Sequence, residues 1–139
     1  MTTLETKLEI KSWDEKPYRE LPDGSKYTRA DVVLGGTGPI ELNGGRIELT
    51  EASFEAMMYY RADGNSTYLS LMTFTGTVDG RHGSLVLAGE GHYDGTSARG
   101  ESRVIDATGE LVGVTGTATS VSTHADYPFM PLTLTYDIA

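Results

Sequence analysis

Residues 55–104 read EAMMYYRADGNSTYLSLMTFTGTVDGRHGSLVLAGEGHYDGTSARGESRV, and this stretch decides the fold. Within it, Asp-Gly pairs at 63–64, 79–80 and 94–95 separate runs of alternating residues. Asp-Gly between such runs is the strongest short-range hairpin signal, because both central residues of a type I′ turn need positive φ. The stretch therefore predicts four consecutive antiparallel strands, near residues 52–61, 66–78, 81–92 and 96–105.

Turns of two residues, without bulges, would fix which side chains share a face of this sheet. On that assumption Tyr59 lies opposite Tyr68, and Glu90 lies opposite Arg99 on the charged, solvent-facing side. The other side is predicted to face the interior. It comprises Glu55, Met57, Tyr59, Tyr68, Ser70, Met72, Phe74, Leu85, Leu87, Gly89, Gly91, Ala98, Gly100, Ser102 and Val104.

The rest of the chain continues the strand pattern, and no stretch shows sustained helical periodicity. A strand is expected at 4–12 and a loop at 13–25, with further strands at 26–34, 39–42, 115–123 and 130–138. We expect one domain over residues 1–139, because that length builds a single core. A sheet this large usually closes to remove its exposed edges, so the predicted fold is all-β: an antiparallel eight-stranded, or nine-stranded, β-barrel.

Composition and missing motifs exclude several classes of function. The formal net charge of −9 favours solubility and argues against nucleic acid or an anionic membrane as partner. The absence of cysteine fits a cytoplasmic protein, and the polar start at 1–10 is typical of neither a signal peptide nor a membrane span. We expect no metal and no cofactor, because there is no phosphate-binding loop and His82, His92 and His124 lack metal-ligand spacing.

Small residues cluster on the predicted interior face of two adjacent strands, at Gly89, Gly91, Ala98, Gly100 and Ser102. An eight-stranded barrel is just wide enough to be filled by side chains or to hold one small ligand. Two interpretations stay open. Either the small residues let the barrel flatten or a loop pack inside, or they leave a cavity walled by Met57, Tyr59, Tyr68, Met72 and Phe74.

Motifs along the whole chain carry a resemblance to a known family. They are SWDEKPY at 12–18, DG at 23–24, KYTRA at 26–30, Glu55 with Met58 and Tyr60-Arg61, FTGT at 74–77, DGR at 79–81, GS at 83–84, TGEL at 108–111 and LTYD at 134–137. Together they resemble domain-of-unknown-function family 3224. The resemblance implies an allene oxide cyclase-like or lipocalin-like β-barrel with an internal cavity. Barrels of this general kind include plant cyclases, dirigent proteins and polyketide cyclases that work without a cofactor.

Four positions depart from the pattern of that family. Relatives tend to have Glu where this chain has Met72, Gln-His at Ala88-Gly89, and Trp at Ser102. The departures predict a wider and more apolar chamber, because the register turns Met72, Gly89 and Ser102 inward. Residues 43–51 form an added loop, which the strand directions place at the same end as 13–25, 79–80 and 107–110.

That end is the predicted mouth of the barrel. Trp13 and Tyr18, beside it, would gate access to the interior, or Trp13 would plug the barrel end. The residues expected to bind a substrate are Trp13, Tyr18, Met57, Ser70, Met72, Phe74, Leu87, Gly89 and Ser102.

Glu55 is the one carboxylate predicted to lie inside, and it is the candidate catalytic acid or base together with Tyr59 and Tyr68. Desolvation would ready it for proton transfer near neutral pH, and the tyrosine hydroxyls would face a bound carbonyl. The alternative is a structural glutamate bonded to Tyr59, Tyr68 or Arg29, with the tyrosines as packing residues.

Three functions are compatible with these residues. The first is a cofactor-independent cyclase or isomerase that folds a hydrophobic, unsaturated, polyketide-like metabolite in natural-product biosynthesis, with Glu55 and a tyrosine polarising a carbonyl. The second is a non-catalytic barrel that binds a small apolar ligand. The third is a structural oligomer with a filled barrel. Whichever function holds, we expect a homodimer or homotrimer, with a predicted outer stripe of Phe54, Met58, Tyr60, Leu69 and Leu71 as the candidate subunit interface.

Overall fold

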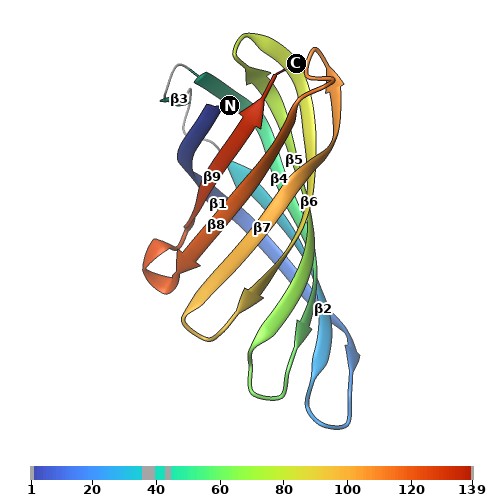
Figure 1. The fold of residues 1–139 in the computed structure, drawn as a ribbon. Coiled ribbons are helices and arrows are strands. Elements are labelled where there is room, and N and C mark those ends of the chain that lie inside the picture. Colours follow the sequence, from blue (N-terminus) through green and yellow to red (C-terminus); the bar gives the residue numbers. More distant parts are fainter. Residues whose placement is uncertain (1, 36–39, 43–44, 139) are drawn as a thin grey trace.

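Eight antiparallel strands form a sheet that closes on itself in a ring (Figure 1). The computed structural model describes residues 2–35, 40–42 and 45–138. The strands are β1 (Thr2–Glu20), β2 (Lys26–Gly35), β3 (Ile40–Leu42), β4 (Gly45–Tyr60), β5 (Ser66–Val78), β6 (Arg81–Tyr93), β7 (Ser97–Gly109), β8 (Thr115–Thr123) and β9 (Phe129–Asp137), with one 3₁₀ turn, η1 (His124–Asp126).

The ring runs β1-β2-β4-β5-β6-β7-β8-β9 and returns to β1, and the pairing of β2 with β4 completes it. The short strand β3 pairs with β4 alone and stands outside the ring. The all-β, antiparallel prediction is confirmed, with eight strands in the ring. In the part of the chain described, no helix has the length and apolar character needed to cross a membrane.

The predicted loop at 13–25 is wrong for most of its length, because β1 continues to Glu20. Only Leu21–Ser25 forms a turn, in which the Leu21 amide donates to the Ser25 carbonyl at 2.9 Å. Two register shifts, after Ile10 and after Pro17, let the long strand bend around the ring. Beyond Glu9 the strand pairs with β2 but no longer with β9, an edge position at which proline is tolerated.

The predicted register between β4 and β5 is wrong by one residue. The Arg61 amide donates to the Asn65 carbonyl at 2.8 Å, and the Gly64 amide donates to the Arg61 carbonyl at 2.9 Å. The turn is therefore a three-residue loop with Gly64 in the left-handed region (φ 91°), a form that adds one residue to the two-residue turn.

A one-residue slip moves every side chain of a strand to the other face. Tyr59 pairs with Thr67, and Met58 pairs with Tyr68. Consequently Phe54 and Met58 point into the ring, and Glu55 points out.

The other two turns keep the predicted faces. Asp79-Gly80 is a two-residue type I′ turn, with φ of 51° and 81°, and Met72 pairs with Leu87 as predicted. At the third turn the central residues are Gly95-Thr96, one position later than predicted. From Leu87 to Tyr93 the pairing of β6 with β7 therefore shifts by two residues, which changes the partners but preserves the face, and a bulge between Val86 and Leu87 shifts the pairing once more.

Partners across β6 and β7 differ from the prediction as a result. Gly89 pairs with Ser102, and Glu90 pairs with Glu101 where Arg99 was expected. The Asp94 carboxylate fixes the turn, because it accepts hydrogen bonds from the backbone amides of Ser97 and Thr96, each at 2.9 Å. These bonds lower the pKa of Asp94 to about 2.

The two ends of the ring differ in their packing. We name them after their turns: the Asp79 end carries the turns at 79–80 and 110–114, and the Asp94 end carries those at 21–25, 61–65 and 94–96 together with η1. Buried side chains fill the Asp79 end and leave a void of only about 20 Å³. They include Leu4, Phe74, Leu85, Leu111, Leu134 and Tyr136.

Tyr136 ties β9 to the turn between β5 and β6. Its hydroxyl donates to Asp79 Oδ2 at 2.9 Å. Burial, and then the bond to Asp79, raises the pKa of Tyr136 to about 12. The hydroxyl is therefore a neutral donor near neutral pH, and it holds the Asp79 end together.

Candidate functional site

A pocket of about 400 Å³ lies inside the ring and extends to the Asp94 end. Residues from the turns of that end, Thr96, His124 and Tyr127, contribute to its lining. The predicted mouth at the Asp79 end is therefore wrong, because the core of leucines fills the ring there. Residues 45–51, predicted as part of a loop at that mouth, belong to β4, and residues 43–44 lie outside the described part of the chain.

One wall of the pocket is aromatic and apolar. The ring of Phe54 on β4 lies 6.4 Å from that of Trp13 on β1 and 6.3 Å, edge to face, from that of Tyr68 on β5. Aromatic pairs at these separations prefer such tilted and edge-to-face geometries. The same wall includes Val32, Leu34, Met58, Tyr60, Met72 and Leu132.

Hydroxyl groups and small residues form the opposite wall, on β7 and β8. Tyr68, Gly91, Gly100 and Ser120 occupy one row across β5, β6, β7 and β8. A Cβ atom at Gly91 would collide with the Tyr68 ring, and one at Gly100 would lie 2.9 Å from the Tyr68 hydroxyl oxygen. The space above these glycines is thus taken by a side chain of β5, not by a loop, and the pocket lies beside it.

Two hydroxyl groups of the pocket lining are buried without a hydrogen-bond partner. They belong to Ser66 and Ser102, and neither has a partner among the residues that the structure describes. Burial also raises the pKa of the nearby Tyr68 hydroxyl above its usual range, so this group remains a neutral donor. Buried polar groups are normally paired, so unpaired ones in a pocket point to a ligand or solvent.

A second carboxylate besides that of the lining residue Glu101 lies behind the pocket wall and belongs to Glu15, which the sequence reasoning missed. The register shift after Ile10 pairs Glu15 with the buried Ala30. Glu15 Oε1 accepts a hydrogen bond from Trp13 Nε1 at 2.9 Å, and Oε2 accepts one from Thr28 Oγ1 at 2.9 Å. Burial, and then a hydrogen bond to Glu15, raises the pKa of the Tyr60 hydroxyl.

Glu15 thus holds two pocket-lining aromatics, Trp13 and Tyr60, while lying behind them. The alternation of Trp13, Glu15 and Pro17 along the chain is typical of a strand and could have indicated this placement. The prolines and the Asp-Gly pair in the same segment led instead to the prediction of a loop.

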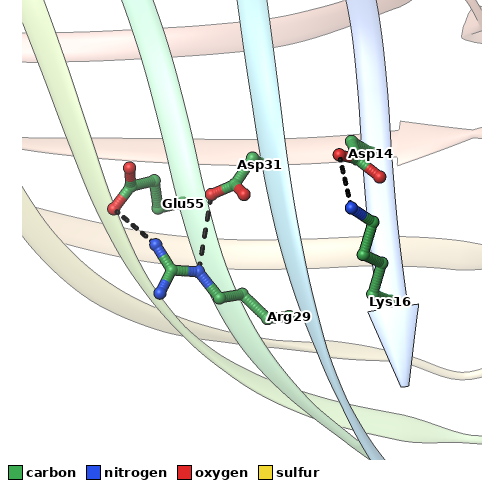
Figure 2. A network of polar contacts seen from close by, with 5 residues as sticks. All are labelled: Asp14, Lys16, Arg29, Asp31 and Glu55. Atoms are coloured by element: carbon green, nitrogen blue, oxygen red, sulfur yellow. Dashed lines mark ion pairs between the residues drawn. The ribbon is translucent and has the colours of Figure 1, made fainter. Parts of the chain in front are cut away.

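Glu55 lies on the outside of the ring, and its predicted place inside is wrong. Its side chain is 59% exposed, and Glu55 Oε2 lies 3.8 Å from Arg29 Nη2. Figure 2 shows Arg29 between Glu55 and Asp31, whose Oδ1 lies 3.5 Å from Arg29 Nε. This arrangement agrees with the alternative prediction for Glu55, a structural glutamate bonded to Arg29.

Five other predicted site residues, Met57 among them, also lie away from the pocket on the outer face or in the packed core. Tyr59 stacks on Tyr27 with ring centroids 5.1 Å apart, and Tyr18 stacks on the other side of Tyr27 at 6.0 Å. Leu87 and Phe74 are buried in the core.

Met57 is also outside the pocket, 55% exposed and paired with Leu69. The outer apolar stripe therefore consists of Met57, Leu69 and Leu71, and the predicted homodimer or homotrimer stays a prediction.

The pocket does bring together Trp13, Tyr68, Ser70, Met72 and Ser102 from the predicted set. Gly89 lies between Ser70 and Ser102 in one row and lets β7 approach closely. Among the described residues, no three histidine or acidic side chains are grouped as metal ligands.

Comparison with known proteins identifies a family but no activity. No curated protein matches the chain. The chain is similar to the crystal structure of a protein with unknown function from the DUF3224 family of Shewanella oneidensis MR-1, with 17% sequence identity, a TM-score of 0.65 and coverage of 99% of each chain. The family model described as "Protein of unknown function (DUF3224)" matches residues 4–136. Because that match spans almost the whole chain, the protein belongs to the DUF3224 family.

Proposed function

We propose that this protein binds a small, uncharged, mostly apolar molecule in the pocket at the Asp94 end. The observation that carries the proposal is the pocket itself, about 400 Å³ in volume and lined mainly by apolar and aromatic side chains. Ligand sites are typically concave, apolar and about 300–1,000 Å³ in volume, with a few placed polar groups. The non-catalytic ligand-binding function considered from the sequence is thus the one that the geometry supports best.

Charge favours an uncharged ligand. No lysine or arginine occurs among the described lining residues, whereas Glu101 does. A carboxylate or phosphate in this pocket would be desolvated without a counter-cation, in a chain whose formal net charge is already −9.

The uncharged dye Nile red tests the proposal, because its fluorescence rises in apolar surroundings. We expect saturable binding and a change in the emission of Trp13, the chain's one tryptophan, which lies on the pocket wall. Ala98→Phe fills the pocket and should weaken binding about tenfold or more. Ala88→Phe places the same bulk on the outer face of β6, where Ala88 pairs with Leu71, and should leave binding unchanged. Equal binding by both variants would contradict the proposal.

A second proposal is that the protein catalyses ring closure or isomerisation of the bound molecule. The cyclase-like character implied by the resemblance likewise stays a prediction. Tyr68 is the observation in its favour, because a neutral, desolvated hydroxyl can polarise a carbonyl while the pocket holds a folded chain. Glu55, on the outer face, takes no part. Mass spectrometry of unsaturated ketones incubated with the protein and with Tyr68→Phe tests it: conversion at equal rates by both removes Tyr68 from the mechanism, and no conversion by either overturns the proposal.

A further inference from the structure

We propose that the hydroxyl groups of Tyr68 and Ser102 form a subsite that binds the carbonyl oxygen of an apolar ketone, ester or lactone. The inference rests on the proposed binding function and names the chemical class of the ligand. It is carried by a buried hydroxyl that lacks a partner and by a second donor placed beside it.

Ser102 is the first donor. Its side chain lines the pocket and is only 9% exposed, and its hydroxyl has no hydrogen-bond partner among the described residues. A buried hydroxyl left unpaired costs free energy that a ligand oxygen would recover. The residue lies in mid-strand, paired with Gly89 on one side and Ala118 on the other. Neither neighbour brings a side-chain acceptor to it.

Tyr68 is the second donor. Its ring lies over Gly91, and its hydroxyl reaches the position where Gly100 would carry a Cβ atom. Gly100 and Ser102 face the same side of β7 two residues apart, a repeat of about 6.7 Å along a strand. One ligand oxygen can bridge two donors at that spacing, since each hydroxyl bond spans about 2.7 Å and both residues line the same pocket.

The hydroxyls of Tyr68 and Ser102 and the apolar side chains around them favour a carbonyl as the bound group. Its oxygen has two lone pairs and can accept from both hydroxyls without needing a donor group of its own. The Tyr68 hydroxyl keeps its proton because burial raises its pKa. Around it lie the edge-on ring of Phe54 and the buried Met58 and Met72, which match an apolar skeleton. A carboxylate is disfavoured, since no lysine or arginine lines the pocket among the described residues.

Three naphthalenes of similar size test this subsite by displacement of Nile red. 2-Acetylnaphthalene carries a carbonyl, 2-ethylnaphthalene replaces it with an apolar group, and 2-naphthoate carries a charge. We expect the acetyl compound to bind the unmodified protein about tenfold tighter than the ethyl compound, because it gains two hydrogen bonds. The naphthoate should not displace the dye.

Ser102→Ala and Tyr68→Phe should each reduce this preference to about threefold or less, with the affinity for 2-ethylnaphthalene unchanged. Ser53→Ala and Tyr59→Phe are matched controls on β4, outside the pocket lining, and should keep the full preference. Circular dichroism verifies that each variant is folded.

Two results would overturn the subsite. One is equal affinity of the acetyl and ethyl compounds for the unmodified protein, a comparison that needs no variant. The other is an unchanged preference in both Ser102→Ala and Tyr68→Phe. In either case binding of Nile red would still support the proposed function. If neither Nile red nor any of the naphthalenes binds, the proposed function fails and the subsite fails with it.

Discussion

Replacing Gly89 with alanine is expected to lower the free energy of unfolding by about 3 kcal/mol or more, because the new methyl group has no room. A Cβ atom at Gly89 would overlap the carbonyl oxygen of Glu101 and lie 2.6 Å from the Cβ of Ser102. The overlap is with backbone of the paired strand β7, so β6 and β7 would have to separate.

Urea unfolding followed by circular dichroism measures the loss. Gly95→Ala is the matched control: Gly95 has φ 94° but no atom within 4 Å of a built Cβ, so only backbone strain remains, about 1 kcal/mol. A Gly89→Ala variant as stable as Gly95→Ala would show that the two strands do not approach as closely as described.

Removal of the Glu15 carboxylate is the second change with a large expected effect. Glu15→Ala leaves the donors Trp13 Nε1 and Thr28 Oγ1 without their acceptor, and it removes the carboxylate beside the Tyr60 hydroxyl, which still donates to Met58 Sδ at 3.7 Å. The Thr28 hydroxyl belongs to a side chain only 1% exposed. We expect the free energy of unfolding to fall by about 2–4 kcal/mol, since buried donors without partners cost about 1–3 kcal/mol each and Trp13 is partly exposed.

The same variant should weaken Nile red binding, because Trp13 and Tyr60 lose the contact that holds them at the pocket wall. The emission of Trp13 reports its release as a shift to longer wavelength.

Glu55→Ala is the matched control. Among the described residues it breaks the exposed contact with Arg29, so it should cost less than about 1 kcal/mol and leave dye binding unchanged. If Glu55→Ala weakened binding and Glu15→Ala did not, the assignment of the two carboxylates would be reversed.

The fold class could be predicted from the sequence because hairpin turns and alternation depend on local residues alone. The register could not, since one dipeptide forms three different turns in this chain. Asp79-Gly80 occupies the two central positions of its turn, Asp63-Gly64 belongs to a three-residue loop, and Asp94 precedes its turn. Only the loop at 63–64 shifts the register by an odd number, and that shift turned Glu55 outward.

The strand pattern of β4 held the information needed to correct this error. Ala52, Phe54, Ala56, Met58 and Tyr60 alternate with Glu51, Ser53 and Glu55, so the apolar set identifies the inward face without reference to the turn. Register in a half-buried strand is set by the hydrophobic pattern as well as by the turn, and here the pattern was the better guide.

Part of the site could not be predicted, because it depends on how strands pair and pack, which a single sequence does not indicate. The bulge after Ile10 decides that Trp13 and Glu15 face inward, and a bulge is a property of the paired strands. Gly89 was predicted to widen the interior, yet it lets β7 come closer. In contrast, Tyr68, Ser70, Met72 and Ser102 were placed on the correct face because the turns at 79–80 and 94–96 preserve it.

The two ends of the ring have different roles. One end is packed with buried side chains, and the other end borders the pocket. Leu85, Leu111 and Leu134 belong to the buried core that stabilises the fold. They lie at the opposite end from the turns that border the pocket. Substitutions at pocket positions such as Ala98 and Ser122 should therefore cost little of the stability that the core provides. If the pocket binds ligands as proposed, members of one lineage with this division can diverge in the molecules they bind while keeping the same packed end.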